Sequence, residues 1–247
     1  MKPNGTAPVL RVSGATGGYG DIVVVRDVSF EVHAGSITAL LGRNGSGKTT
    51  TMRLVSGLNP LVAGDVELDG ESIGSMPAHV RVGKGLAYVQ EGKRIFRKRS
   101  VRENVVLGAY TAKLSRREGA ERVDEAFDRF PALAAKAAMP AGSLSGGQQQ
   151  MLAVAQALAP RPRVLMLDEP TTGLAPAIVG ELFELVAGLR AEGLAVVLVE
   201  QSLELTLGVA DTAVVINLGS VVFEGDASHE RTRLAAEEIY LGAGAAL

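Results

Sequence analysis

The sequence predicts an α/β fold with a mainly parallel core sheet, an antiparallel β region near the N-terminus and a helical insert. Three observations favour this fold class. Apolar strands alternate with helices in the second half of the chain, a glycine-rich loop separates a strand from a helix near residue 42, and strand patterns stop between about residues 92 and 143. The composition agrees, because 47% of the 247 residues are hydrophobic and 30 are glycines, which is typical of a well-filled α/β core.

The first elements follow from local patterns. Apolar and polar residues alternate over Val28–Val32, which indicates a half-buried strand, and Ile37–Leu41 forms a second, more apolar one. The alternation is lost over Lys48–Ser56, a stretch that ends at Gly57 and is predicted to be helical. A short β segment at Asp65–Leu68 follows. Strand, glycine-rich loop and helix are therefore expected in that order.

Helical spacing identifies the insert, because Val123, Phe127 and Phe130 lie at i, i+4 and i+7 on one face. We therefore expect a helical subdomain over residues 92–143, inserted into a core formed by residues 9–91 and 144–247, within one domain of residues 1–247.

Apolar strands return after the insert, at Val164–Leu167, Ala195–Val199 and Ala213–Ile216. A helix lies between the first two of these strands. Its apolar face is formed by Ile178, Leu182, Leu185, Val186 and Leu189. Alternating strands and helices favour a mainly parallel sheet.

Charge and cysteine content exclude several classes of function. The 25 Lys and Arg and 27 Asp and Glu give a net charge of −2, so no nucleic-acid partner is expected and any phosphate site must be local. The absence of cysteine excludes a disulfide framework, a thiolate metal site and a cysteine nucleophile. Apolar runs fall far short of the roughly 20 residues that span a bilayer. We expect a soluble chain that reaches a membrane only by docking onto another protein.

The strongest motif runs from Gly42 to Thr49 and fits G-x-x-x-x-G-K-[ST] between a predicted strand and helix. In such a loop, glycines let backbone N–H groups surround a phosphate, the lysine reaches phosphate oxygens and the hydroxyl binds Mg²⁺. The alternative is a glycine-rich turn with a surface lysine. The predicted nucleotide-binding residues are Gly42, Asn44, Gly45, Ser46, Gly47, Lys48, Thr49 and Thr50.

Two adjacent carboxylates, Asp168 and Glu169, follow a buried strand at the end where open α/β sheets bind ligands. Asp168 is expected to hold hydrated Mg²⁺ together with Thr49, and Glu169 to orient or deprotonate an attacking water. An acidic pair at a strand end is otherwise an ordinary turn or helix-entry feature. The phosphate loop earlier in the chain favours the functional interpretation.

A third motif, Leu144-Ser145-Gly146-Gly147-Gln148, precedes a predicted helix over Gln149–Ala159. Ser145 is a natural N-cap and the two glycines expose backbone N–H groups, so this helix start is a second candidate phosphate site. A plain capped helix is the alternative.

With these three motifs in this order and spacing, nearly the whole chain resembles the ATP-binding subunits of ABC transporters. The resemblance implies a P-loop NTPase of ABC type with a RecA-like core. It implies that two such subunits enclose two MgATP molecules, each held by one subunit's phosphate loop and the other subunit's signature at residues 144–148. Closure would then drive two integral membrane permease subunits, with the chain peripheral at the cytoplasmic face of the inner or plasma membrane.

Shorter segments resemble one subtype. Glu91–Phe96, Gly173–Pro176, Val199–Gln201 and the terminal Tyr240-Leu-Gly are similar to the ATPase of branched-chain amino acid importers that pairs with a second, similar ATPase. That resemblance implies an external solute-binding protein as an indirect partner. The alternatives are an importer of urea or short-chain amides, a soluble ABC ATPase without a membrane partner, and a nucleotide-binding regulatory subunit without turnover.

The chain also departs from the general family pattern. Either Gln90 or Glu91 occupies the position of the usual Q-loop glutamine, and Glu91 there would be a further Mg²⁺ ligand. Gln201 replaces the usual switch histidine and is expected to sense the γ-phosphate through neutral hydrogen bonds. The loop at Gly173–Pro176 lacks the usual aspartate. These departures suggest an asymmetric heterodimer, with homodimerisation in isolation left open.

Two further features have both functional and ordinary interpretations. Tyr19 matches the aromatic residue on which the family stacks adenine, or it is a tyrosine packed at a loop. A basic segment is either a solvated face or, as the resemblance implies, a surface that docks on the membrane partner. It comprises Lys93, Arg94, Arg97, Lys98, Arg99 and Arg102.

Overall fold

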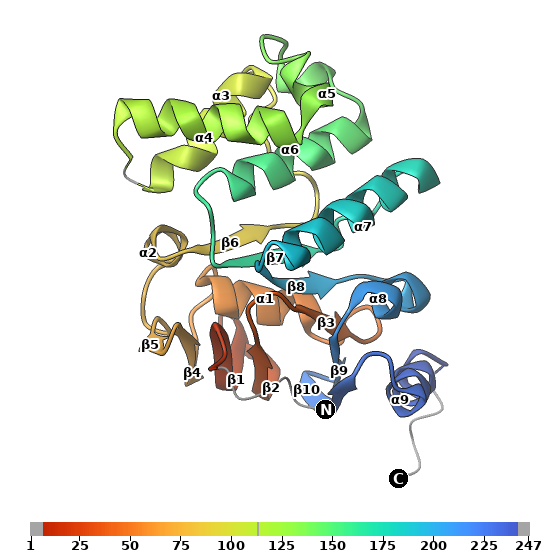
Figure 1. Cartoon of the computed structure of the whole chain (residues 1–247). Helices are drawn as coiled ribbons and strands as arrows, with labels where there is room; N and C mark the ends of the chain where they lie inside the picture. Colours follow the sequence, from red (N-terminus) through yellow and green to blue (C-terminus); the bar gives the residue numbers. More distant parts are fainter. Residues whose placement is uncertain (1–6, 113, 242–247) are drawn as a thin grey trace.

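The computed structural model describes residues 7–112 and 114–241, which form two sheets and the helices around them (Figure 1). The strands are β1 (Leu10–Tyr19), β2 (Ile22–Val32), β3 (Ile37–Leu41), β4 (Ala63–Leu68), β5 (Glu71–Ser72), β6 (Leu86–Val89), β7 (Val164–Asp168), β8 (Ala195–Val199), β9 (Thr212–Asn217) and β10 (Ser220–Asp226). The α-helices are α1 (Lys48–Ser56), α2 (Ala78–Gly83), α3 (Val101–Ala109), α4 (Arg116–Arg129), α5 (Pro131–Ala134), α6 (Gly146–Leu158), α7 (Pro176–Ala191), α8 (Leu203–Val209) and α9 (Glu230–Leu241). The predicted α/β class is confirmed.

The N-terminal sheet has the strand order β2-β1-β4-β5, and every pairing in it is antiparallel. Leu10 lies opposite both Val32 and Leu68, which places apolar side chains of three strands in one row. Irregular register between Val12 and Gly18 bends β1 where its glycines lie. This sheet is the antiparallel β region that the sequence predicts.

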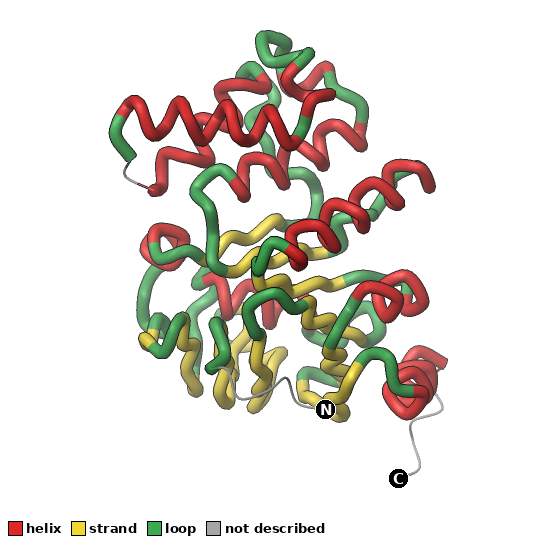
Figure 2. The backbone as a smooth tube through the Cα atoms, in the orientation of Figure 1, coloured by secondary structure: helices red, strands yellow, loops and turns green. Residues whose placement is uncertain are grey.

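The core sheet has the order β10-β9-β3-β8-β7-β6. Figure 2 shows strands in yellow at the centre of the molecule, with helices in red around them. β9, β3, β8, β7 and β6 run parallel, and only β10 joins antiparallel as a hairpin partner of β9. Every residue of β3, β7 and β8 is buried, as expected for parallel strands covered on both faces. The mainly parallel core is therefore confirmed.

Successive side chains of the core strands enter different hydrophobic clusters. Val164 and Met166 pack with α1 and the antiparallel sheet, whereas Leu165 and Leu167 pack with α6 and α7. Figure 1 shows the result, with α1 between the two sheets and α6 and α7 on the other side of the core sheet. The two helices that begin at the predicted phosphate-binding motifs therefore cover opposite faces.

The helical segment after β6 packs through Val123 and Phe130, which are buried, and Phe127, which is partly buried. Ser100 and Ser115 begin α3 and α4 with complete capping boxes. The same hydrophobic cluster continues through α6 to β6, β7 and β8, across the subdomain boundary predicted at residue 143. That boundary stays a prediction, and the packing across it is continuous.

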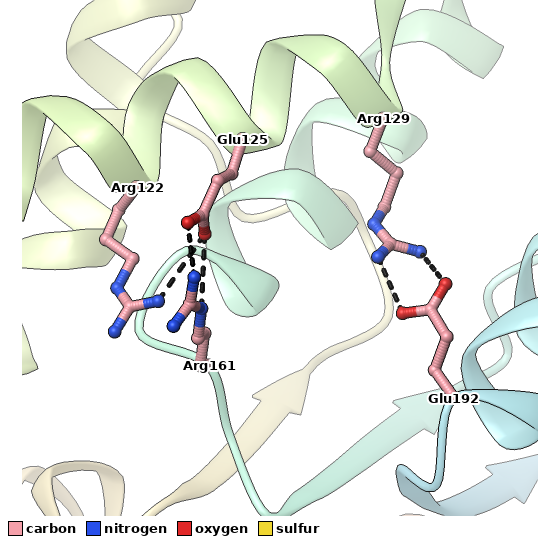
Figure 3. A network of polar contacts seen from close by, with 5 residues as sticks. All are labelled: Arg122, Glu125, Arg129, Arg161 and Glu192. Carbon is pink, nitrogen blue, oxygen red and sulfur yellow. Dashed lines mark hydrogen bonds and ion pairs between the residues drawn. The ribbon is translucent and has the colours of Figure 1, made fainter.

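Ion pairs also join the helical segment to the core (Figure 3). The two terminal guanidinium nitrogens of Arg129 on α4 donate to the carboxylate of Glu192 after α7, at 2.8 and 2.6 Å. Arg161, in the loop before β7, pairs with Glu125 of α4, which also bonds Arg122.

Within residues 7–112 and 114–241, no helix combines the length and the apolar character needed to cross a membrane.

Candidate active site

The glycine-rich loop leaves β3 and leads directly into α1. Gly42, Gly45 and Gly47 have φ values of 147°, 80° and 110°, which side-chain-bearing residues rarely adopt. A Cβ at Gly42 would lie 2.2 Å from the carbonyl oxygen of Ile216. The loop can follow this path only with glycine, and the path ends at the N-terminus of a helix, where free N–H groups favour anions.

Lys48 is only 5% exposed, and its Nζ donates to the carbonyls of Gly42 at 2.7 Å and Arg43 at 3.1 Å. Burial lowers the pKa of Lys48, and the carboxylates of Glu169 and Asp168 oppose this shift. The ammonium group is thus held inside the curve of the loop.

The loop also contains an unpartnered polar atom. The Oγ of Ser46 is buried and makes no hydrogen bond within the described residues. An unsatisfied buried hydroxyl beside a lysine and several backbone N–H groups fits a phosphate, because phosphate oxygens accept such bonds. Thr50 is buried at the start of α1, whereas Asn44 and Gly45 lie exposed at the rim. The predicted loop residues are therefore contiguous around one concave backbone.

Asp168 ends β7 beside the start of α1. Thr49 Oγ1 donates to Asp168 Oδ1 at 3.1 Å, and the Tyr88 hydroxyl donates to Oδ2 at 2.7 Å. Burial raises the pKa of Asp168, these two hydrogen bonds oppose the rise, and the nearby Glu169 and Glu91 carboxylates add to it. The structure thus brings the two predicted Mg²⁺ ligands together, and a hydroxyl and a carboxylate this close are suitable ligands for that ion.

Tyr88 was not among the residues predicted from the motifs. It belongs to β6, which pairs with β7 so that Tyr88 lies opposite Met166. Burial, followed by the charge of Asp168, raises the pKa of the Tyr88 phenol, so the hydroxyl remains a donor to that carboxylate. Strand order alone brings it to the site.

Glu169 follows β7 with φ at 46°, a left-handed conformation that costs energy in any residue other than glycine. Its backbone N–H donates to the carbonyl of Val199 at 2.9 Å. Gln201 Nε2 donates to Glu169 Oε2 at 2.6 Å, and Thr172 Oγ1 approaches the same oxygen at 3.3 Å. Glu169, predicted to act on the attacking water, and Gln201, predicted to sense the γ-phosphate, are thus in direct contact.

Glu200, between Val199 and Gln201, belongs to a segment quoted for its resemblance to the importer ATPases, but it was not among the predicted site residues. It is 2% exposed, and its carboxylate accepts hydrogen bonds from Thr171 and from the backbone of Gln201. Burial raises the pKa of Glu200, and these donors partly offset the rise. The available signal was its position directly after an apolar strand, the same position that Glu169 occupies.

Glu91 lies two residues beyond β6 and is exposed, and its charge acts on Asp168. Gln90 is partly buried beside it. Both Gln90 and Glu91 therefore remain candidates for the Q-loop position.

The signature segment forms the start of α6. Ser145 accepts a bond from the Gln148 backbone and completes a capping box, and Leu144 is buried just before it. A Cβ at Gly147 would lie 2.8 Å from Ile178, whereas Gly146 is exposed. Because α6 and α1 cover opposite faces of the core sheet, the structure does not bring this segment to the phosphate loop of the same chain.

Tyr19 ends β1 with 48% of its surface exposed. The Arg53 guanidinium lies 5.8 Å from the ring centroid. Asn59 donates to the carbonyl of Gly18 at 2.6 Å and accepts from Arg53 at 3.0 Å, which fixes the strand end near α1. An exposed, supported ring is available for stacking.

Comparison with known proteins agrees with this geometry. The family model described as ABC transporter matches residues 25–172. The branched-chain amino acid transport ATP-binding protein BraG of Pseudomonas aeruginosa is 37% identical over 91% of this chain and 95% of its own length. The probable branched-chain amino acid transport ATP-binding protein LivF of Archaeoglobus fulgidus is 39% identical over 89% of this chain and 93% of its own length. The lipopolysaccharide export protein LptB of Escherichia coli is 33% identical over 89% and 91%.

Solved structures match as well. An ATP-binding cassette of an ABC transporter in its ADP conformation superimposes with a TM-score of 0.82 at 26% identity, covering 96% of this chain and all of the other. A phosphate loop, an Asp–Glu pair at a strand end and a capped signature helix are thus combined with a family match over most of the sequence. The chain therefore belongs to the ABC transporter family, as an ATP-hydrolysing subunit.

Proposed function

We propose that this chain powers a membrane importer of branched-chain, hydrophobic amino acids. The observation that carries the proposal is the convergence of the phosphate loop, the Thr49–Asp168 pair and the Glu169–Gln201 pair at the carboxyl ends of three neighbouring strands. The proteins named BraG and LivF, at 37% and 39% identity, support the choice of solute class.

In the proposed reaction, the loop residues Gly42–Thr50 bind the phosphates of ATP, with Lys48 moving its donors from loop carbonyls to phosphate oxygens. Tyr19 stacks on the adenine. Thr49 and Asp168, with Glu91 nearby, would hold Mg²⁺, which neutralises phosphate charge when bound. Glu169 accepts the proton of the attacking water or orients it, and Gln201 hydrogen-bonds that water or the γ-phosphate.

The proposed assembly includes a second ATP-binding subunit. Residues 144–148 lie on the opposite face from the phosphate loop of their own chain, so a complete site needs the loop of one subunit and the signature of another. The absence of the usual aspartate from Gly173–Pro176 and the presence of Gln201 favour a partner that is similar but not identical. Isolated chains are free to form a homodimer instead.

The remaining proposed partners are two integral permease subunits at the cytoplasmic face of the inner or plasma membrane, and through them an external solute-binding protein. The basic segment at residues 93–102 is the surface proposed to dock on the permease. No nucleic-acid partner is proposed, because the net charge is −2.

Export is the second candidate, because LptB, a lipopolysaccharide export protein, is 33% identical to this chain. The higher identity to BraG and LivF favours import. The resemblance to importers of urea or short-chain amides rests on the segments Gly173–Pro176 and Val199–Gln201.

The test is uptake by cells of the source organism in which the gene is deleted and then restored. Uptake of labelled leucine, isoleucine and valine is expected to fall on deletion, to return with the native chain and to stay low with Glu169→Gln, because that change removes the proposed base. Urea uptake serves as the comparison. Unchanged amino-acid uptake in the deleted strain would contradict the proposed solute, and a selective loss of urea uptake would replace it.

A further inference from the structure

Glu200 is a buried carboxylate with no ion pair among the described residues. Glu200 directly follows β8 and is 2% exposed. Oε1 accepts from the Thr171 backbone N–H at 2.8 Å, and Oε2 accepts from the Thr171 hydroxyl at 2.8 Å and from the Gln201 backbone N–H at 3.2 Å. Two oxygens thus serve three donors from two separate segments.

Burying such a group lowers the stability of the fold. Removing a carboxylate from water without a cation costs energy that hydrogen bonds only partly return, and an apolar side chain of similar size would cost less. Stability alone therefore does not account for a glutamate here. The functional parts that it contacts offer a reason.

The donors belong to the two segments that carry Glu169 and Gln201. Thr171 lies in the turn that follows Glu169, where the backbone is left-handed at φ 46° and Thr172 N–H bonds the Glu169 carbonyl at 3.2 Å. Strained residues of this kind persist where surrounding contacts fix them. Glu200 supplies two such contacts to the turn and a third to Gln201.

We propose that Glu200 is a positioning residue for hydrolysis: its buried carboxylate fixes the turn after Glu169 against the backbone of Gln201, so that the Gln201 amide reaches the Glu169 carboxylate. The inference rests on the proposed roles of Glu169 and Gln201. Within the described residues, no hydrogen bond or ion pair joins Glu200 to the phosphate loop or to the Thr49–Asp168 pair, so Glu200 is proposed to act through its neighbours.

Glu200→Gln isolates this role, because it keeps the shape and one carbonyl oxygen but replaces the other oxygen with an NH₂ donor. The amide oxygen can still accept from the Thr171 N–H, and the Thr171 hydroxyl can rotate to accept. The Gln201 N–H then faces a second donor and loses its acceptor. The change is expected to disturb Gln201 more than the turn.

The experiment measures ATP hydrolysis by the complex assembled with its native partner subunits, taking the rate of a Glu169→Gln complex as the baseline. Once this baseline is subtracted, Glu200→Gln is expected to lower kcat about tenfold. The KM for ATP is expected to change less than about twofold, because the phosphate-binding residues are unchanged. In a Gln201→Ala background, Glu200→Gln is expected to cost less than about twofold more, because both changes disable the same contact.

Glu204→Gln, the same change at an exposed glutamate on α8, is the matched control and should leave kcat unchanged. If Glu200→Gln does not fold, the pair Thr171→Val and Thr171→Ser decides, because only serine keeps the hydroxyl donor to Glu200. Valine is then expected to lower kcat at unchanged KM, and serine to restore it.

Full additivity of Glu200→Gln and Gln201→Ala, an unchanged kcat, or a loss confined to KM would overturn the inference. These results differ from failure of the proposed function. If native and Glu169→Gln complexes hydrolyse ATP equally, the proposed role of Glu169 fails, and the inference fails with it.

Discussion

At the scale of single residues, the Asp168 side chain shows how the site depends on its neighbours. One carboxylate oxygen is bonded by Thr49, and the other by Tyr88 at 2.7 Å. The side chain is 1% exposed, so water cannot replace a lost donor at little cost. The hydrogen bond from the Tyr88 hydroxyl therefore reduces the free-energy cost of burying the Asp168 carboxylate beside α1.

We therefore predict that Tyr88→Phe lowers the free energy of unfolding by about 1–3 kcal/mol, because it leaves a buried carboxylate oxygen without its donor. Urea unfolding of the isolated chain in chelator-containing buffer measures the difference. Tyr110→Phe removes the same hydroxyl from a side chain that is 82% exposed and should change stability by less than about 0.5 kcal/mol. Equal effects of the two changes would contradict this account of Asp168.

At the scale of elements, α4 is joined to the core by ion pairs as well as by apolar packing. Arg129 holds Glu192 through two parallel hydrogen bonds, and this contact lowers the pKa of Glu192 and raises that of Arg129, so the two shifts agree (Figure 3). The side chains are 35% and 54% exposed, so solvent screening limits the gain.

Glu192→Gln is predicted to lower the free energy of unfolding by up to about 1 kcal/mol near neutral pH. The folded-state pKa of Glu192 lies below its ordinary value of 4.5, so this contribution is present above pH 4.5 and is lost as the pH falls through the folded-state pKa. Urea unfolding of both proteins across this range measures it. The difference should also shrink in high salt, and a difference that grows on acidification would contradict the assignment.

At the scale of the whole molecule, unpaired positive charge gathers on the segment before α3. Within the described residues, Arg99 pairs with Glu103 and Arg102 with Asp124, whereas Arg94, Arg97 and Lys98 are exposed and form no ion pair. Phe96, 53% exposed, lies among them. An apolar ring within a basic surface is suited to a protein partner that carries acidic and apolar groups.

We predict that reversing Arg94, Arg97 and Lys98 to glutamate lowers solute transport at least severalfold, because the permease contact loses its charge complementarity, while ATP binding by the isolated chain stays unchanged. Uptake in cells and nucleotide titration measure the two properties. Reversal of Arg116 and Arg231, exposed on α4 and α9, is the control. Transport at the native rate in the triple variant would exclude this surface as the docking site.

Much of this molecule could be predicted from local pattern. Ile37–Leu41, Lys48–Ser56 and Ala195–Val199 have the predicted bounds, because each is a short run with one clear period between strong end signals such as Gly42 and Gly57. β1 escaped prediction, since its sequence contains three glycines and no sustained alternation. It is a strand because β2 and β4 pair with it on both sides.

The residues of the candidate site likewise fall into two groups, those predicted from sequence motifs and those found only in the structure. The loop, Asp168, Glu169 and Ser145 are carried by motifs whose local context is sufficient. Tyr88 and Glu200 reach the site because β6, β7 and β8 are neighbours in the core sheet. The periodicity of a single strand does not predict the order of the strands in a sheet, so these two residues could not be predicted from it. The residues at or just beyond the carboxyl end of each parallel strand are where such side chains would be sought.

The strand order also bears on how the chain folds as it is synthesised. β3 is fully buried in the folded protein, and among the described strands it pairs with β8 and β9, which begin at residues 195 and 212. The ribosome must therefore release most of the chain before this apolar strand finds either neighbour, and loop closures of this length slow folding. Until then β3 is an exposed apolar strand that is prone to aggregation, and only the N-terminal antiparallel strands and α1 are available to cover it. Chains halted before residue 195 should accordingly be the ones that need chaperones.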